Sequence, residues 1–398
     1  MVDFLHVTPH QVLLDSLRLG RKVYETGFRP KHAISIWRGG AAVGLGVDSF
    51  FRSRGLFINH TTIATESYTG IDTHDEVRVK GLQHVIDSVC REDALLIIDD
   101  VYETGNTIKA IIETLRKQAR ANTPERILVA TIHRKPERVE YSGVDTLCLE
   151  DVPGSTWIDY PHELGDLVTD NPDDPFIKSK SMEVWNLLRE EGFKPTNEQL
   201  STPYKYVQAD ELLLDAFRLG TTVFNDSDFW PDFIVALWPG GISAGLPLHE
   251  VYKYKIKKSG QDRPYPDHIS LNTSSTHLTY RTNVLGLDYL HENINTGDNI
   301  LLVDTVFKSG RFVNDALIKL KEMLRRNLSL DRVRVASVYW NPDDEATWTV
   351  QPFIKQPHYY VKKVSGKIIY PHALHRLDNP RTELKSLVPD YFDVLFSD

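Results

Sequence analysis

The sequence predicts an α/β protein of two tandem domains, each a mainly parallel sheet flanked by helices. One observation is that short apolar runs alternate with helical periods, as where ALLIIDD is followed by IKAIIETLRK. A second is that this order returns about two hundred residues later, where NILLVD is followed by VNDALIKLKEML. Parallel sheets of this kind bind ligands at the carboxyl ends of their strands, so the loops after these strands are candidate sites.

Further landmarks recur in the same order and indicate a tandem duplication. The clearest pairs are VLLDSLRLG and LLLDAFRLG (12–20 and 212–220), SIWRGGAAVGLG and ALWPGGISAGLP (35–46 and 236–247), and DYPHEL and IYPHAL (159–164 and 369–374). We therefore expect a first domain at 1–165, a linker with a packing helix at 166–204, and a second domain at 205–398.

Apolar, β-branched runs place the strands, and 3.6-residue periods place the helices. The expected strands are 32–37, 94–100 and 126–134 in the first domain, and 233–238, 299–304 and 332–340 in the second. The expected helices are 108–117, 182–191 and 313–324.

Composition limits the class of protein. The chain has 398 residues, a net charge of −9 and 41% hydrophobic residues, so DNA and RNA are not expected partners. No run approaches the roughly 18 apolar residues of a membrane span, and the first residues lack a signal-peptide pattern. Cys90 and Cys148 give neither a disulfide framework nor a metal spacing, so we expect a reducing, cytoplasmic location.

The stretch LLIIDDVYETGNT (95–107) carries the strongest chemical signal. Asp99 and Asp100 end a buried strand, where adjacent carboxylates are costly unless a sugar diol or Mg²⁺ compensates them. The loop that follows lies at a helix N-terminus, where backbone N–H groups favour a phosphate, although a simple capped turn has the same sequence pattern. The acids and the loop together suggest one sugar phosphate held at both ends. The loop residues are Thr104, Gly105, Asn106 and Thr107.

Residues 95–107 resemble the phosphoribosyl-pyrophosphate (PRPP) signature of type I phosphoribosyltransferases, an apolar strand with two acids and then (D/E)TG-x-T. WRGG at 37–40 resembles the pyrophosphate loop of the xanthine-guanine-hypoxanthine branch. Residues 67–80 resemble the mobile loop that covers PRPP. TIHRKP at 131–136 resembles the segment whose lysine meets the purine 6-oxo group, and GSTWIDYPHEL at 154–164 is similar to the small hood over the base.

The resemblance implies Mg²⁺-dependent transfer of ribose 5-phosphate from PRPP to a purine base, releasing pyrophosphate, in purine salvage or nucleotide biosynthesis. Guanine, hypoxanthine or xanthine is the expected acceptor. The implied site residues are Arg38, Gly39 and Gly40 for the pyrophosphate, Asp99 and Asp100 for the ribose and Mg²⁺, Thr104 to Thr107 for the 5′-phosphate, Glu103 as general base, and Lys135, Trp157 and Ile158 for the purine.

Other interpretations stay open. Without the resemblance, Lys135 would be a solvated cation and Trp157 a half-buried packing residue. The hood has Pro161-His162 where the xanthine-guanine enzymes have Pro-Trp, so a modified purine such as a deazapurine is an alternative acceptor. Two other classes are a non-catalytic PRPP- or nucleotide-sensing regulator and a hydrolase acting on sugar phosphates.

The second copy lacks most of these groups. We therefore expect a degenerate domain that serves as an intramolecular pseudo-dimer partner. Ligand binding there is an alternative because Lys308 and Arg311 leave its loop basic, and a homodimer of the whole chain also stays open. The replacements are Asp100 by Thr305, Glu103 by Lys308, Arg38 by Pro239, Lys135 by Asn341 and Trp157 by Lys367.

Overall fold

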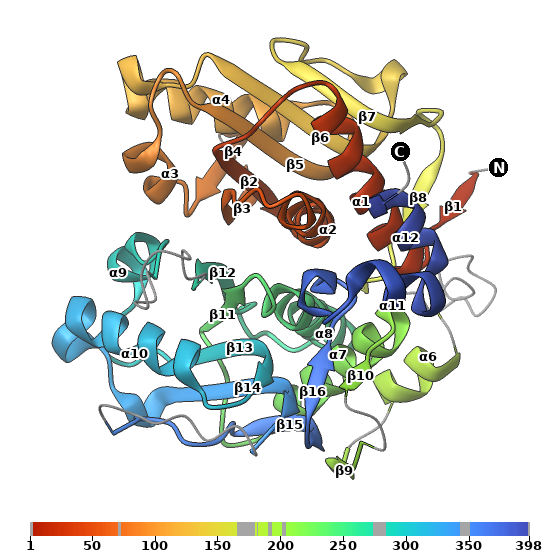
Figure 1. The fold of residues 1–398 in the computed structure, drawn as a ribbon. Coiled ribbons are helices and arrows are strands. Elements are labelled where there is room, and N and C mark those ends of the chain that lie inside the picture. The colour runs from red at the N-terminus through yellow and green to blue at the C-terminus, as the bar shows by residue number, and fades with distance from the viewer. Residues whose placement is uncertain are drawn as a thin grey trace. The chain divides into compact units, whose positions relative to one another are not determined.

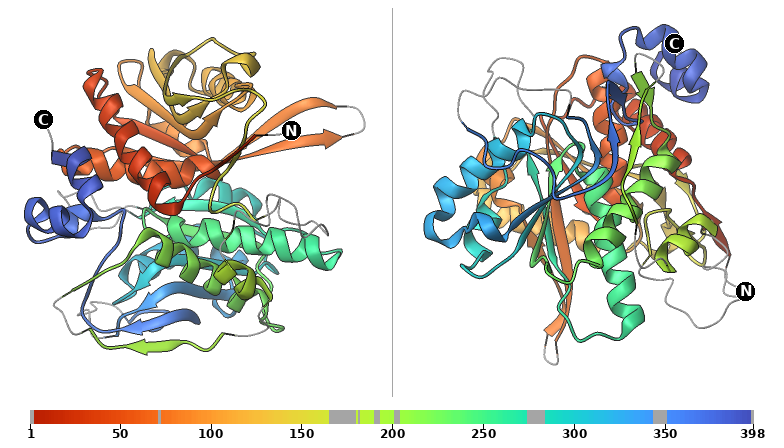
Figure 2. Two further views of the ribbon diagram at one scale, coloured as in Figure 1. Left: turned by 90° about the vertical axis from the view of Figure 1, so that its right-hand side faces the viewer. Right: turned by 90° about the horizontal axis from the view of Figure 1, so that it is seen from below.

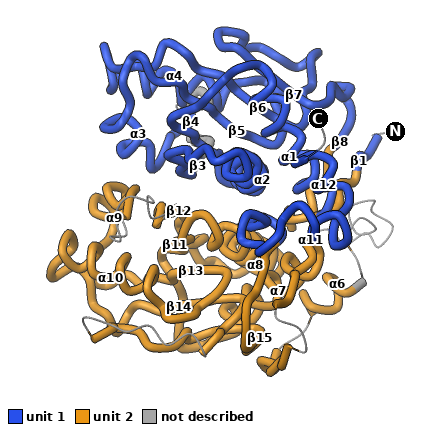
Figure 3. The backbone as a smooth tube through the Cα atoms, in the orientation of Figure 1, with its two compact units in different colours: residues 1–5, 10–157, 371–398 blue, residues 6–9, 158–370 orange. Residues whose placement is uncertain are grey.

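The computed structural model contains two compact units (Figures 1 and 3). Unit 1 comprises 1–5, 10–157 and 371–398, and unit 2 comprises 6–9 and 158–370. No helix among the described residues is long and apolar enough to cross a membrane. The structure describes residues 3–70, 73–164, 180, 182–189, 193–200, 204–273, 284–342 and 351–396.

Unit 1 is built around a six-stranded sheet in which all neighbouring strands are parallel except β3 and β4. Figure 2 shows β3 and β4 as a long hairpin, in orange, that projects from the sheet. The strand order is β4 (Thr73–Lys80), β3 (Asn59–Gly70), β2 (His32–Trp37), β5 (Ala94–Tyr102), β6 (Arg126–Arg134) and β7 (Asp145–Asp151).

Helices cover both faces of this sheet because alternate strand residues point to opposite sides. Ile34 and Ile97 belong to one core cluster with Ile111 of α4. On the other face Ser35 lies against Gly44 of α2, where an added methyl group would overlap its hydroxyl. The helices are α1 (Pro9–Glu25), α2 (Gly39–Ser53), α3 (Gln83–Ser88) and α4 (Asn106–Ala119).

Unit 2 has an equivalent sheet, and every pair of neighbouring strands in it is parallel. The predicted α/β class, with parallel-dominated sheets flanked by helices, is thus confirmed. The strand order is β12 (Asp267–Asn272), β11 (Phe233–Trp238), β13 (Ile300–Phe307), β14 (Val333–Trp340), β15 (Tyr359–Val364) and β9 (Thr196–Glu198). The flanking helices are α7 (Ala209–Phe224), α8 (Ile242–Ser259), α9 (Asp288–Asn293) and α10 (Arg311–Leu324).

The duplication extends to unusual backbone angles. Gly105 (φ 82°) and Gly310 (φ 70°) precede the first residues of α4 and α10. Arg120 (φ 52°) and Arg325 (φ 48°) follow the ends of the same helices, in a region that non-glycine residues seldom adopt. Matching left-handed residues at matching positions show that the two units repeat one backbone design.

The chain also forms two short, two-stranded sheets. Strand β1 (Phe4–His6) pairs with β8 (Trp157–Asp159), and β10 (Tyr204–Tyr206) pairs with β16 (Lys367–Ile369). These pairs match in chain order, since each joins the start of one repeat to its end.

The segments that follow the short sheets are exchanged between the repeats. In unit 1, Tyr391 of the C-terminal helix α12 (Pro389–Phe396) stacks on His10 of α1, with ring centroids 4.9 Å apart. In unit 2, Trp185 of α6 (Met182–Arg189) packs in a cluster with Phe217 of α7. The amide of Leu164 also donates to the buried Glu250 of α8 (3.2 Å).

The packing units therefore differ in extent from the sequence repeat. Residues 158–164 and 182–189 pack with the second sheet, and residues 371–396, including α11 (Pro380–Leu387), pack with the first. The predicted boundaries at 165 and 205 refer to the repeated sequence. Unit 1, in contrast, includes residues 371–396 of the second repeat, and unit 2 includes 158–164 of the first repeat and 182–189 of the predicted linker.

Candidate active site

The adjacent acids lie at the carboxyl end of β5. The first five residues of this strand are buried, and Asp99 and Asp100 follow them at half-buried positions. The amide of Asp100 donates to Oδ1 of Asp99 (3.1 Å), and the amide of Val101 donates to Oδ1 of Asp100 (2.8 Å). Backbone amides therefore hold both carboxylates at the carboxyl-terminal end of this central strand.

The two carboxylates are costly to ionise together. Burial, and then the neighbouring charge of Asp100, raise the pKa of Asp99 well above its ordinary value. Burial also raises the pKa of Asp100, although the amide of Val101 and the positive charge of Arg38 oppose this. A bound cation or ligand hydroxyl groups would relieve the cost, so the pair is suited to a ligand.

The WRGG turn lies directly against these acids. Arg38 immediately precedes α2, whose first residues are Gly39 and Gly40. A methyl group on Gly39 would overlap the Asp100 carboxylate, and one on Gly40 would lie 2.8 Å from the Cα of Asp99. Only glycine permits this approach, which brings the predicted pyrophosphate loop and the acid pair to one place.

The predicted phosphate loop connects β5 to α4. Gly105 is in the left-handed conformation immediately before α4, and Thr107 lies in that helix's first turn. A Cβ atom at Gly105 would lie 2.7 Å from the Tyr102 hydroxyl. The amide of Tyr141 donates to the carbonyl of Thr104 (3.1 Å), so residues beyond β6 hold the loop. The N-terminus of α4 thus follows the carboxyl end of β5 after one short loop.

Glu103 and Lys135 are paired with each other. Lys135 follows β6, its amide donates to the carbonyl of Tyr102 (2.9 Å), and its side chain is only 8% exposed. Its Nζ lies 3.3 Å from Oε1 of Glu103. The same oxygen lies 2.5 Å from a guanidinium nitrogen of Arg138, a residue that the sequence analysis did not single out. The one available signal was the proline after Lys135, because it begins the tight turn at Pro136–Arg138.

The predicted base residues fall on both sides of the unit boundary. Trp157 belongs to unit 1, is 42% exposed, and donates its amide to the carbonyl of Asp3 (2.8 Å). Ile158 is buried and packs with unit 2, so its role in a base pocket stays a prediction. The predicted mobile loop coincides with the β3–β4 hairpin, and residues 71 and 72 at its tip lie outside the described residues.

The acid pair also suits a magnesium ion. Within the described residues, no group of three or more His, Cys, Asp or Glu side chains could hold a metal ion. Mg²⁺, however, is usually bound through one or two carboxylates together with water and substrate phosphates. Asp99 and Asp100 fit that pattern, because they are two adjacent carboxylates at the carboxyl end of β5.

No family model and no curated protein sequence matches this chain. Parts of it resemble solved structures. One is a hypothetical protein from Neisseria gonorrhoeae with bound ppGpp (20% identical, covering 45% of this chain and 94% of that chain, TM-score 0.35). Another is a purine phosphoribosyltransferase from Pyrococcus horikoshii (21% identical, covering 41% and 95%, TM-score 0.32). A third is the xanthine-guanine-hypoxanthine phosphoribosyltransferase of Helicobacter pylori (18% identical, covering 39% and 91%, TM-score 0.29).

Proposed function

We propose that unit 1 is a Mg²⁺-dependent phosphoribosyltransferase, which transfers ribose 5-phosphate from PRPP to a purine base and releases pyrophosphate. One observation carries most of the support. An acid pair, a glycine turn with an arginine and a helix N-terminus converge at the end of β5. These three groups suit the ribose hydroxyls, the pyrophosphate and the 5′-phosphate of PRPP, respectively.

Asp99 and Asp100 would bind the ribose hydroxyls and hold Mg²⁺. The metal would supply positive charge near the pyrophosphate as a hard, oxygen-liganded cation. The 5′-phosphate would accept hydrogen bonds from the amides between Gly105 and Thr107, where the dipole of α4 also favours negative charge. The acids would thus hold the ribose hydroxyls, and the loop after β5 would hold the 5′-phosphate at the other end of the sugar.

Arg38, Gly39 and Gly40 would bind the pyrophosphate. As the bond from C1′ to the pyrophosphate oxygen breaks, its electron pair leaves with that oxygen, and the charge on the leaving group grows. A guanidinium and backbone amides that are already in place stabilise such charge without reorganisation.

Lys135 and Glu103 would act on the base. A 6-oxo oxygen would accept a hydrogen bond from Lys135, and Trp157 would stack on the purine ring. As a ring nitrogen forms its bond to C1′, the proton of the base would pass to a carboxylate oxygen of Glu103. The expected acceptors are guanine, hypoxanthine and xanthine, because each carries this oxygen. The β3–β4 hairpin, which includes residues 67–70 and 73–80, would cover PRPP and exclude water.

The test is to incubate the protein with PRPP, Mg²⁺ and a panel of purines, deazapurines and pyrimidines. Mass spectrometry then follows pyrophosphate and new nucleotides. We expect nucleotide from a 6-oxopurine, and none from the double variant Asp100→Asn/Glu103→Gln. Asp304→Asn, at the position of unit 2 equivalent to Asp99, is a control for removal of a carboxylate from the second copy of the motif and should behave as the unchanged protein.

Each other outcome has a definite meaning. Nucleotide from a deazapurine alone would keep the reaction and change the acceptor to a modified purine. PRPP binding without nucleotide from any base would refute the enzyme, and a PRPP-sensing regulator would then explain the site. Pyrophosphate released without a nucleotide would indicate a hydrolase.

A further inference from the structure

A single carboxylate oxygen in the site receives two cations. Oε1 of Glu103 lies 3.3 Å from Nζ of Lys135 and 2.5 Å from a guanidinium nitrogen of Arg138. The three side chains differ in exposure, with 8% for Lys135, 34% for Glu103 and 51% for Arg138. The shorter contact therefore belongs to the more exposed cation, and the longer one to the buried ammonium.

The buried ammonium needs an oxygen partner at all times, because an uncompensated charge is costly to bury. Glu103 is the carboxylate that meets this need in the structure. A base that accepts a hydrogen bond from Lys135 would replace Glu103 as its partner. The exchange leaves Glu103 without one of its two cations at the step in which that carboxylate is needed.

The turn that carries Arg138 is held by several contacts. Its amide donates to the carbonyl of Lys135 (3.0 Å), within the turn that follows β6. Gly154 packs against this turn, since its amide donates to Glu137 (3.0 Å) and a Cβ atom there would lie 3.1 Å from Cγ of Arg138. Arg138 thus lies between Glu103 and the segment that leads to Trp157.

We propose that Arg138 is a positioning residue, which keeps the Glu103 carboxylate in place while Lys135 exchanges Glu103 for the oxo group of the base. This inference rests on the proposed function and adds to it a residue that sets the affinity for the base. Without Arg138, Lys135 and Glu103 form a simple one-to-one pair. The base must then compete for the Lys135 ammonium with a Glu103 carboxylate that is no longer shared with Arg138.

The test compares Arg138→Gln with Arg138→Lys in steady-state kinetics, varying the base and PRPP separately. Arg138→Gln should raise KM for the base about fivefold, the scale of a partly exposed ion pair, and should lower kcat by no more than about fivefold, because Glu103 is held less firmly; KM for PRPP should stay within about twofold. Arg138→Lys keeps the charge and should recover most of the loss. Arg134→Gln is the matched control, because it removes a similar arginine–carboxylate pair, with Asp151 at 2.7 Å, from the end of β6, just before the turn of Arg138.

A binding measurement separates positioning from folding. In calorimetry, Arg138→Gln should weaken binding of the product nucleotide in the otherwise unchanged protein, but not in a protein that already carries Glu103→Gln. An Arg138→Gln variant that matches Arg134→Gln, or that raises both KM values equally, overturns the inference. If the unchanged protein makes no nucleotide, the proposed function fails and this inference fails with it.

Discussion

The carboxyl ends of β5 and β13 share a backbone and differ in charge. In both, a glycine with positive φ precedes the helix, and an aspartate accepts the amide of the next residue, at 3.1 Å for Asp99 and 2.7 Å for Asp304. The next side chain is the carboxylate of Asp100 in unit 1 but the hydroxyl of Thr305 in unit 2, 3.3 Å from Ser243 of α8. The duplicated fold preserves the geometry of the turn, while the groups that would meet a ligand have changed.

The base position shows the same contrast. Lys135 directs its ammonium toward Glu103, a group with a chemical role in the proposed reaction. The equivalent Asn341 is buried and donates to the carbonyl of Gly366 (2.7 Å), beside Lys367. A side chain that would face a ligand in one unit therefore holds a turn in the other, which fits a scaffold role for unit 2.

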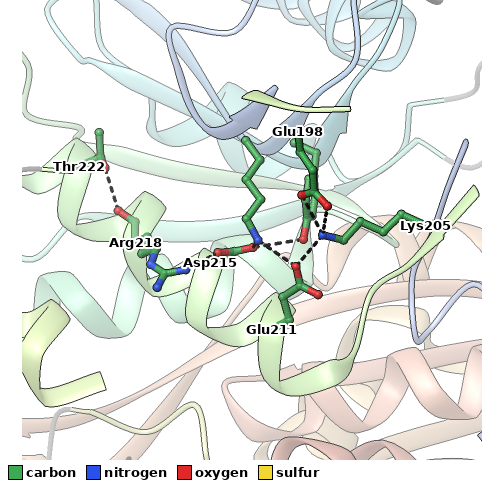
Figure 4. Close-up of polar contacts among 8 residues, drawn as sticks. Glu198, Lys205, Glu211, Asp215, Arg218 and Thr222 are labelled. Carbon is green, nitrogen blue, oxygen red and sulfur yellow. Dashed lines mark hydrogen bonds and ion pairs between the residues drawn. The ribbon is translucent and has the colours of Figure 1, made fainter. Parts of the chain in front are cut away.

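Unit 2 contains a network of ion pairs around one buried carboxylate, Asp215 (Figure 4). The fully buried Asp215 contacts Lys362 (2.6 Å) and Arg218 (2.8 Å), and Tyr339 donates to it (3.2 Å). Lys362 also contacts Glu211 (2.8 Å), which pairs with Lys205 as well. These contacts join α7, β14 and β15, so they stabilise the fold of this unit.

The largest expected effect distinguishes the loop after β5 from the equivalent loop after β13. Glu103→Gln should lower kcat at least about 100-fold, because it removes the general base. Lys308→Gln, at the equivalent position of unit 2, should leave kcat within about twofold. Steady-state rates with PRPP and a 6-oxopurine measure both, and equal losses would mean that unit 2 takes part in the reaction.

The next effect concerns the ion-pair network around Asp215 in unit 2. Lys362→Met should lower the free energy of unfolding by about 3–5 kcal/mol, since it leaves the buried Asp215 without its closest cation. Lys363→Met is the matched control, because Lys363 lies over the Trp340 ring (4.6 Å), and its loss should cost under about 1 kcal/mol. Urea denaturation measures the free energy of unfolding of both variants. Equal losses would contradict a stabilising role for the ion-pair network.

The exchanged segments offer a third comparison. Tyr391→Ala should destabilise unit 1 by about 3 kcal/mol, because this side chain is 1% exposed and stacks on His10. Trp185→Ala should destabilise unit 2 by a similar amount, since it removes the centre of the α6 cluster. Hydrogen exchange read separately for each sheet measures the effects. If Tyr391→Ala lowered the protection of the unit 2 sheet, or Trp185→Ala that of the unit 1 sheet, the assignment of these segments to the two units would be wrong.

The smallest effect concerns the acid pair. The folded chain binds a proton on Asp99 more tightly than the unfolded chain, because its folded pKa is raised. The associated stability is present below the ordinary carboxyl pKa and is lost as pH rises through the folded value. Asp99→Asn should therefore raise the free energy of unfolding by about 1 kcal/mol at neutral pH, and less in acid.

Denaturation at several pH values measures this difference. The same raised pKa predicts that Mg²⁺ and PRPP displace a proton when they bind, so their affinity should increase with pH. A stability gain from Asp99→Asn that grows as pH falls would refute the assigned direction.

Local pattern predicted much of the fold. The runs at 32–37 and 126–134 are β2 and β6, because their largely apolar sequence suits strands whose middle residues are covered on both faces. The place of the acid pair near the end of β5 also follows from sequence, since the continuous apolar run stops at the two carboxylates, although the strand itself continues to Tyr102.

Features that depend on packing could not be predicted. The contact of Arg138 with Glu103 depends on a tight turn that brings β5 and β6 residues together. The exchange of segments depends on the hydrophobic surfaces against which Trp185 and Tyr391 pack. The repeat in the sequence does not reveal these surfaces, because it would be the same if each segment packed against the other sheet. The extra edge strand β9 is only three residues long and has no apolar pattern.

The most direct measurement is a calorimetric titration of the chain with PRPP in the presence of Mg²⁺. If unit 1 holds the active site and unit 2 is its scaffold, one PRPP should bind per chain. Asp100→Asn should abolish that binding, and Asp304→Asn should leave it unchanged. Two binding sites per chain, or binding that survives Asp100→Asn and is lost with Asp304→Asn, would contradict this assignment.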